Sequence, residues 1–203
     1  MNHRFHDADY VKSYAESING RRPERMQVFQ SAADLVGELP FPRSHVVELC
    51  CGSGVLGEVL LTRLPDITYE GVDFSQPMLD LASETLVSFA DRIDLHQSDL
   101  NTDDWARLLR CPVHAIVSNM ALHDLGTKES VVKTYREAFR ILERGGVIFN
   151  ADLVKPADSD PGTGSRLKVA EHIDALESVG FLDVASTLDF GGYVGVVGRK
   201  AGD

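Results

Sequence analysis

The chain has 203 residues, of which 43% are hydrophobic, and it carries a formal net charge of -11 at pH 7. This length supports one hydrophobic core rather than two domains, and no apolar run reaches the about 18 residues of a membrane span or resembles a signal peptide, so we expect a cytoplasmic protein. The negative charge repels phosphate backbones and argues against nucleic acid as a partner, while the oligomeric state stays open.

Two helices are predicted before the first strand, over residues 9–17 and 23–39. The second helix has Pro23 in its first turn, where the missing N–H of proline costs nothing. This amino-terminal segment, residues 1–44, either packs as structural padding or folds over a ligand as a lid. We treat it as a helical lid and residues 45–203 as the ligand-binding domain.

From residue 45 onward, short apolar runs alternate with longer amphipathic ones, which is typical of parallel strands joined by crossover helices. Gly191 and Gly192 separate the last two strands and favour a hairpin, so the last strand is expected to be antiparallel. A loop rich in Pro, Gly, Ser and Asp is predicted over residues 155–165. The predicted strands are 45–50, 67–73, 92–99, 113–119, 147–154, 181–190 and 193–200. The predicted helices are 53–64, 76–89, 103–110, 128–144 and 166–180.

The stretch GSGVLG, residues 52–57, follows the first of these strands and matches the glycine pattern of dinucleotide-binding loops. Gly52 and Gly54 lack Cβ atoms and allow a close approach between backbone and ligand. Glu48 lies at the end of the strand, where it would repel a pyrophosphate but would attract a cation. The loop therefore predicts a cofactor, and Glu48 favours a cationic one.

The residues ELCCGSG, 48–54, resemble the first motif of the class I S-adenosylmethionine (SAM)-dependent methyltransferases, with Cys50 at a position more often occupied by glycine. SAM carries a sulfonium and an ammonium group, which suits the carboxylate of Glu48. The resemblance continues in the expected order through residues 46–153. It implies SAM as the cofactor and an α/β, Rossmann-like fold with a seven-stranded, mostly parallel sheet, an antiparallel last strand and helices on both faces.

The later motifs imply further cofactor-binding residues at the ends of the second, third and fourth strands. YEGVDFSQPMLDLA places Asp73 on the ribose hydroxyls, with Phe74 and Met78 beside the adenine. LHQSDLNTDDW implies that Asp99 accepts from the adenine amino group while the N–H of Leu100 faces the ring. HAIVSNMALHDL adds Ser118 at the end of the fourth strand.

Methyl transfer requires an aligned nucleophile and, for an alcohol or ammonium acceptor, removal of a proton. His123, in SNMALHDL, is a candidate general base, with a local hydrogen bond as the alternative. Asn119 either orients a ligand or caps the segment after it, and Asp152 either binds an amine substrate or satisfies loop N–H groups. Tyr10 and Tyr14 are candidates for the lid, or they pack.

The sequence therefore predicts a SAM-dependent methyltransferase that acts on an oxygen or nitrogen of a small molecule, because the segments available to roof the site are short. Three alternatives stay open: an enzyme that cyclises or cleaves SAM, an NAD-dependent dehydrogenase, and a noncatalytic SAM-binding module. No metal is expected, because Cys50, Cys51 and Cys111 lack metal-ligand spacing. The adjacent pair at the end of an apolar run is interpreted as reduced core residues.

Overall fold

The computed structural model describes residues 3–159 and 166–202, so residues 160–165 of the loop predicted over 155–165 lie outside it. The described residues form a seven-stranded sheet in the order β3-β2-β1-β4-β5-β7-β6. Strands β1 to β5 pair in parallel, whereas β7 is antiparallel to both β5 and β6. This arrangement confirms the predicted fold. The strands are β1 His45–Leu49, β2 Thr68–Asp73, β3 Ile93–Gln97, β4 Val113–Asn119, β5 Leu142–Leu153, β6 Leu182–Asp189 and β7 Tyr193–Arg199.

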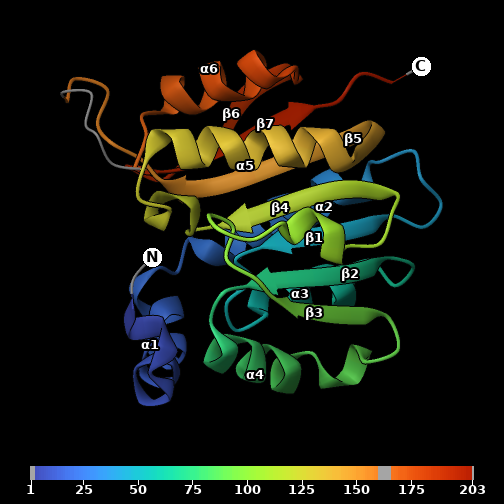
Figure 1. Ribbon diagram of the computed structural model, residues 1–203, viewed down its shortest axis with the longest axis vertical. Coiled ribbons are helices and arrows are strands. Elements are labelled where there is room, and N and C mark those ends of the chain that lie inside the picture. Colours follow the sequence, from blue (N-terminus) through green and yellow to red (C-terminus); the bar gives the residue numbers. More distant parts are fainter. Residues whose placement is uncertain (1–2, 160–165, 203) are drawn as a thin grey trace.

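Helices cover both faces of the sheet, with α5 and α6 in front of it and α2 and α3 behind it (Figure 1). Alternate residues of β1 serve the two sides, since Val47 packs in the cluster under α5 and α6 while Val46 packs with α2 and α3. This is the period-2 alternation expected of a strand buried on both faces. The α-helices are α1 Ala8–Arg21, α2 Arg25–Gly37, α3 Val55–Arg63, α4 Gln76–Thr85, α5 Lys128–Ile141 and α6 Val169–Val179. Short 3-10 turns are η1 His3–His6, η2 Val87–Phe89, η3 Trp105–Leu108 and η4 Leu122–Asp124.

Several predicted boundaries differ from the structure by a few residues, and three elements differ in kind or extent. The helix expected over 76–89 is interrupted after Thr85, and the one expected over 103–110 shortens to η3. Strand β5 starts at Leu142 instead of 147, because buried Leu142 pairs with β4 before the register shifts. Near this shift the backbone of β5 lies close to β4 at Gly146, where a Cβ would be 2.8 Å from the carbonyl oxygen of His114.

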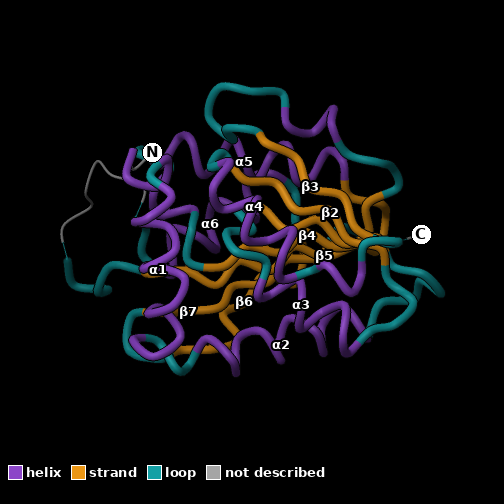
Figure 2. The backbone as a smooth tube through the Cα atoms, turned by 90° about the horizontal axis from the view of Figure 1, so that it is seen from below, coloured by secondary structure: helices purple, strands orange, loops and turns teal. Residues whose placement is uncertain are grey.

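The two amino-terminal helices occupy different places. Helix α2 buries Val28, Phe29 and neighbouring side chains in the core behind the sheet. Helix α1 lies instead at the end of the sheet where β1, β2 and β4 finish (Figures 1 and 2). Of the predicted lid, η1 and α1 are therefore the parts that reach the strand ends. No helix within the described ranges combines the length and apolar character needed to cross a membrane.

Candidate active site

A cavity of about 540 Å³ lies at the carboxyl ends of the central strands, and residues of η1 and α1 form part of its lining. Ligands of open α/β sheets bind at this edge, and small-molecule pockets commonly have volumes of about 300–1,000 Å³. Of the predicted site residues, ten line it: Tyr10, Tyr14, Glu48, Cys50, Gly52, Asp73, Phe74, Met78, Asn119 and His123. Five do not: Gly54, Asp99, Leu100, Ser118 and Asp152.

The loop between β1 and α3 forms one wall through left-handed backbone. Cys50, Gly52 and Gly54 have φ angles of 55°, 54° and 78°. Gly52 faces the cavity, whereas a Cβ on Gly54 would come within 3.2 Å of the α4 backbone. The Gly54 position thus serves packing between helices. Gly57 also serves packing, because a Cβ there would lie 2.7 Å from the Tyr69 ring.

Asp73, at the end of β2, is held in place by two backbone groups. Its Oδ2 accepts from Gly52 N and its Oδ1 accepts from Ser75 N, both at 2.9 Å. Burial raises the pKa of Asp73, and these hydrogen bonds oppose the rise. The carboxylate is therefore oriented before any ligand arrives, with remaining lone pairs available for hydroxyl groups.

Glu48 is a nearly inaccessible carboxyl group on β1, 3% exposed. The Tyr69 hydroxyl donates to its Oε2 at 2.7 Å. Burial raises the pKa of Glu48 to about 8, although the Tyr69 hydrogen bond and the charge of Arg25 act in the opposite direction. A cation bound beside Glu48 would offset the loss of hydration that burial causes.

His123 lines the cavity and is fixed by Asp152 from β5. Its Nδ1 lies 2.6 Å from Asp152 Oδ1, and its backbone N donates to Oδ2 at 2.8 Å. Leu153 N also donates to this carboxylate, which is 1% exposed. Asp152 therefore accepts from one backbone N–H group of η4 and one of β5, and it positions His123.

The pKa of His123 reflects competing effects. Burial lowers it, but the hydrogen bond to Asp152 and the charges of Asp152 and Asp124 outweigh burial, so the net pKa is raised. Because an ionised carboxylate only accepts hydrogen bonds, Nδ1 carries the proton. In the neutral ring Nε2 is then the basic nitrogen. It lies 3.8 Å from Asp124 Oδ2.

Other predicted residues have structural partners around the cavity. Asn119 lines it, and its Oδ1 accepts from the Tyr193 hydroxyl. Ser118 Oγ donates to the carbonyl of Leu49 at 3.0 Å and so links β4 to β1. Asp99 Oδ1 accepts from Asn101 N within its own loop. The adenine-binding roles of Asp99 and Leu100 stay predictions.

Three arginines near the junction of α1 and α2 also line the cavity and were not predicted: Arg21, Arg22 and Arg25. Asp124, from η4, is a further lining residue that the sequence reasoning missed. The arginines lie in RRPER, a short polar stretch that has the composition of a solvated helix junction. Their orientation depends on where α1 lies relative to the sheet, which local sequence does not specify.

Comparisons with known proteins agree with this architecture. A family described as "Methyltransferase domain" matches residues 46–146. A trans-aconitate 2-methyltransferase of Variovorax paradoxus (strain S110) is 30% identical over 174 residues, which cover 84% of this chain and 62% of that protein. A protein of the same name from Paracidovorax citrulli (strain AAC00-1) is 31% identical over 118 residues, covering 58% of this chain and 42% of the relative. The chain thus spans less than two thirds of either relative.

Solved structures share the fold at low sequence identity. An O-methyltransferase family protein from Burkholderia thailandensis has a TM-score of 0.76 at 18% identity, covering 98% of this chain and 62% of that one. DesVI of Streptomyces venezuelae has a TM-score of 0.72 at 20% identity, covering 95% of this chain and 98% of that one. Sheet order, glycine loop and sequence matches together define a SAM-dependent methyltransferase fold. Through residues 46–146 the chain belongs to this methyltransferase family.

Proposed function

We propose that the protein transfers a methyl group from SAM to an oxygen atom of a small molecule, with His123 removing the proton of a hydroxyl group. SAM supplies a methyl group on a positively charged sulfur. The observation that carries the proposal is the His123–Asp152 pair, in which a buried carboxylate orients a histidine on the cavity wall. Such an oriented imidazole suits proton removal near neutral pH.

The residues at the strand ends fit this cofactor. Glu48 accepts hydrogen bonds from two neutral groups, the Tyr69 hydroxyl and the N–H of Gly57, and it is influenced by the charge of Arg25. The SAM ammonium would add a positive charge beside it. Asp73 would accept from both ribose hydroxyls. Phe74 and Met78 line the cavity beyond Asp73, in support of their predicted place beside the adenine.

Oxygen is favoured over nitrogen by the charges around the cavity. The predicted anchor for an amine, Asp152, binds His123 and does not line the cavity. Glu48, Asp73 and Asp124 line one side of the cavity, and the three arginines on the other side would repel a cationic amine. The relatives named for trans-aconitate support a small-molecule acceptor.

The test combines product analysis with variants. Purified protein is incubated with SAM and a panel of small hydroxyl compounds, and mass spectrometry should detect a methylated product together with S-adenosylhomocysteine (SAH). Methylthioadenosine formed from SAM alone would refute methyl transfer and favour an enzyme that cleaves SAM. No turnover with bound SAM would favour a noncatalytic module.

His123→Gln should lower kcat by about 10²–10⁴-fold while the affinity for SAH, measured by calorimetry, stays unchanged. His114→Gln is the matched control, because His114 lies near the start of β4, at the opposite end from the site. An unchanged kcat in His123→Gln would exclude the base role.

A further inference from the structure

The cavity has two walls of opposite charge. The sheet wall, formed by the strand ends and η4, contributes the carboxylates of Glu48, Asp73 and Asp124. The arginine wall, near the α1–α2 junction, contributes Arg21, Arg22 and Arg25. None of the cavity-lining residues between η1 and the start of α2 is acidic: these are Phe5, Tyr10, Tyr14, Ile18 and the three arginines. These three cations line the cavity in a chain whose net charge is -11.

The charge of SAM is complementary to the sheet wall rather than to the arginine wall. Its sulfonium and ammonium give two positive charges against one carboxylate, so its net charge is positive and suits the acidic side. One carboxylate is matched by one bidentate guanidinium. Three arginines therefore exceed what the one carboxylate of the cofactor can pair, and they offer a site for an anion from a second molecule.

Arg25 shows the clearest need for such a partner. Its Nη1 donates to Asn19 Oδ1 at 2.7 Å, and its guanidinium lies 5.0 Å from the centre of the Phe29 ring. Its Nε is buried and has no hydrogen-bond partner among the residues that the structure describes. A buried charged donor without an acceptor is costly, and a carboxylate on the cavity side would remove this cost.

Arg21 and Arg22 are more accessible and only loosely held. Arg22 Nη1 lies 3.3 Å from Glu24 Oε1, with the Arg22 side chain 40% exposed. Arg21 lies with its guanidinium 5.4 Å from the centre of the Tyr14 ring. Weak, partly exposed contacts of this kind cost little to rearrange, so both side chains remain available to a ligand.

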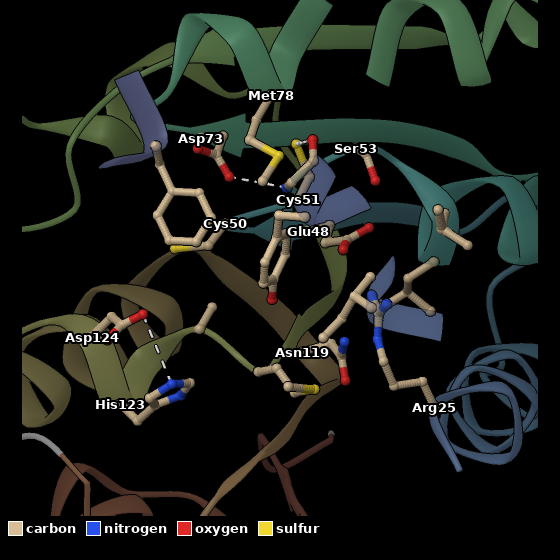
Figure 3. A pocket seen from close by; sticks show the side chains of 18 of the residues that line it. Arg25, Glu48, Cys50, Cys51, Ser53, Asp73, Met78, Asn119, His123 and Asp124 are labelled. Carbon is tan, nitrogen blue, oxygen red and sulfur yellow. Dashed lines mark hydrogen bonds and ion pairs between the residues drawn. The ribbon is translucent and has the colours of Figure 1, made fainter. Parts of the chain in front are cut away.

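We propose that the methyl acceptor is a small hydroxy acid whose carboxylate is bound by the arginine wall while its hydroxyl group lies at His123. Figure 3 shows Arg25 and His123 on opposite sides of Asn119, with Glu48, Cys50 and Asp73 along the other side of the cavity. A molecule with a carboxylate at one end and a hydroxyl group at the other would lie between Arg25 and His123 and would leave the sheet wall to SAM. The proposal rests on the oxygen methylation proposed above.

The test uses matched pairs of compounds that differ only in the anion: 3,4-dihydroxybenzoate with its carboxamide, 2-hydroxybenzoate with its carboxamide, and citrate with its tricarboxamide. Calorimetry measures their binding to SAH-loaded protein. We expect at least one acid to bind about tenfold or more tightly than its amide. Equal binding within every pair, or no binding of any acid, would overturn the proposal.

Variants then identify which carboxylate the arginines bind. Arg22→Gln and Arg25→Gln should each reduce the preference for the acid about tenfold, with binding of the amide and of SAH within twofold of the native protein. Arg63→Gln, on α3 and paired with Asp34 away from the cavity, is the control. Loss of SAH affinity with an unchanged acid preference would show that the arginines serve the cofactor, and the proposal would fail.

The two proposals fail differently. If acids bind through the arginine wall but no bound acid is methylated, the anion site stands and oxygen methylation is wrong. If amides are methylated as fast as their acids, the methyltransferase activity stands and the hydroxy-acid assignment is wrong.

Discussion

Glu48 couples stability to cofactor binding, and Glu48→Gln tests this coupling. Burial raises the pKa of this carboxyl from 4.5 to about 8. A carboxyl whose folded pKa is raised contributes stability below its unfolded pKa and loses that contribution as pH rises toward the folded value. Each pKa unit corresponds to about 1.4 kcal/mol, so by pH 7 the protein without cofactor has lost up to about 3 kcal/mol of its free energy of unfolding.

Glutamine keeps the shape of Glu48 and can accept the hydrogen bond from Tyr69, but it does not titrate. Glu48→Gln should therefore unfold at a higher temperature than the native protein at pH 7, by as much as roughly 6–12 °C for a chain of this length. The difference should widen from pH 5 to pH 8 and vanish near pH 4. Thermal unfolding of the protein without SAM over this pH range measures it.

The same substitution should weaken SAM binding about tenfold or more, because the ammonium group loses its ionised partner. Glu84→Gln, on an exposed position of α4, controls for the loss of surface charge and should change stability by less than about 0.5 kcal/mol. A Glu48→Gln protein that is less stable at pH 8, or whose stability difference is independent of pH, would refute the reasoning.

Three further results are expected. Asp152→Asn removes the charge that raises the pKa of His123, so the acidic limb of the kcat profile should move to lower pH; a limb that stays in place would contradict this. Gly54→Ala places a side chain at φ 78° against α4 and should lower the free energy of unfolding by about 1–3 kcal/mol in urea titrations. Ser75 caps α4 and also donates a hydrogen bond to the carbonyl of Phe5. Ser75→Asp keeps the cap but cannot donate this bond, so it should increase hydrogen exchange in α1. It should not cause the loss of helix stability expected of Ser75→Ala.

Sequence could predict residues whose positions follow from strand ends. Asp73 and Asn119 are the last residues of β2 and β4, and parallel strands end at one edge, so alternation alone brings them together. The position of Glu48 could be predicted for the same reason, and its negative charge favoured a cationic cofactor over one that carries a pyrophosphate. These positions follow from the period of the pattern, whereas the ribose role of Asp73 is what the resemblance to the methyltransferase motifs implies.

Residues whose roles depend on packing between distant segments could not be predicted in the same way. The His123–Asp152 pair joins η4 to β5 across 29 positions, and either residue alone has a plausible local role. Arg25 becomes a cavity residue only because α2 packs behind the sheet while α1 crosses to the strand ends. The early start of β5 likewise depends on Leu142 reaching Val113.

The amino-terminal turn connects the two walls of the cavity. Ser75, which donates to the carbonyl of Phe5, follows the loop that fixes Asp73, so η1 is attached to the segment predicted to bind ribose. Phe5 also packs edge-on against Tyr10 and Tyr14 of α1, the helix that ends at the arginine wall. A cofactor bound at Asp73 would thereby lie beside the segment that holds η1 and α1.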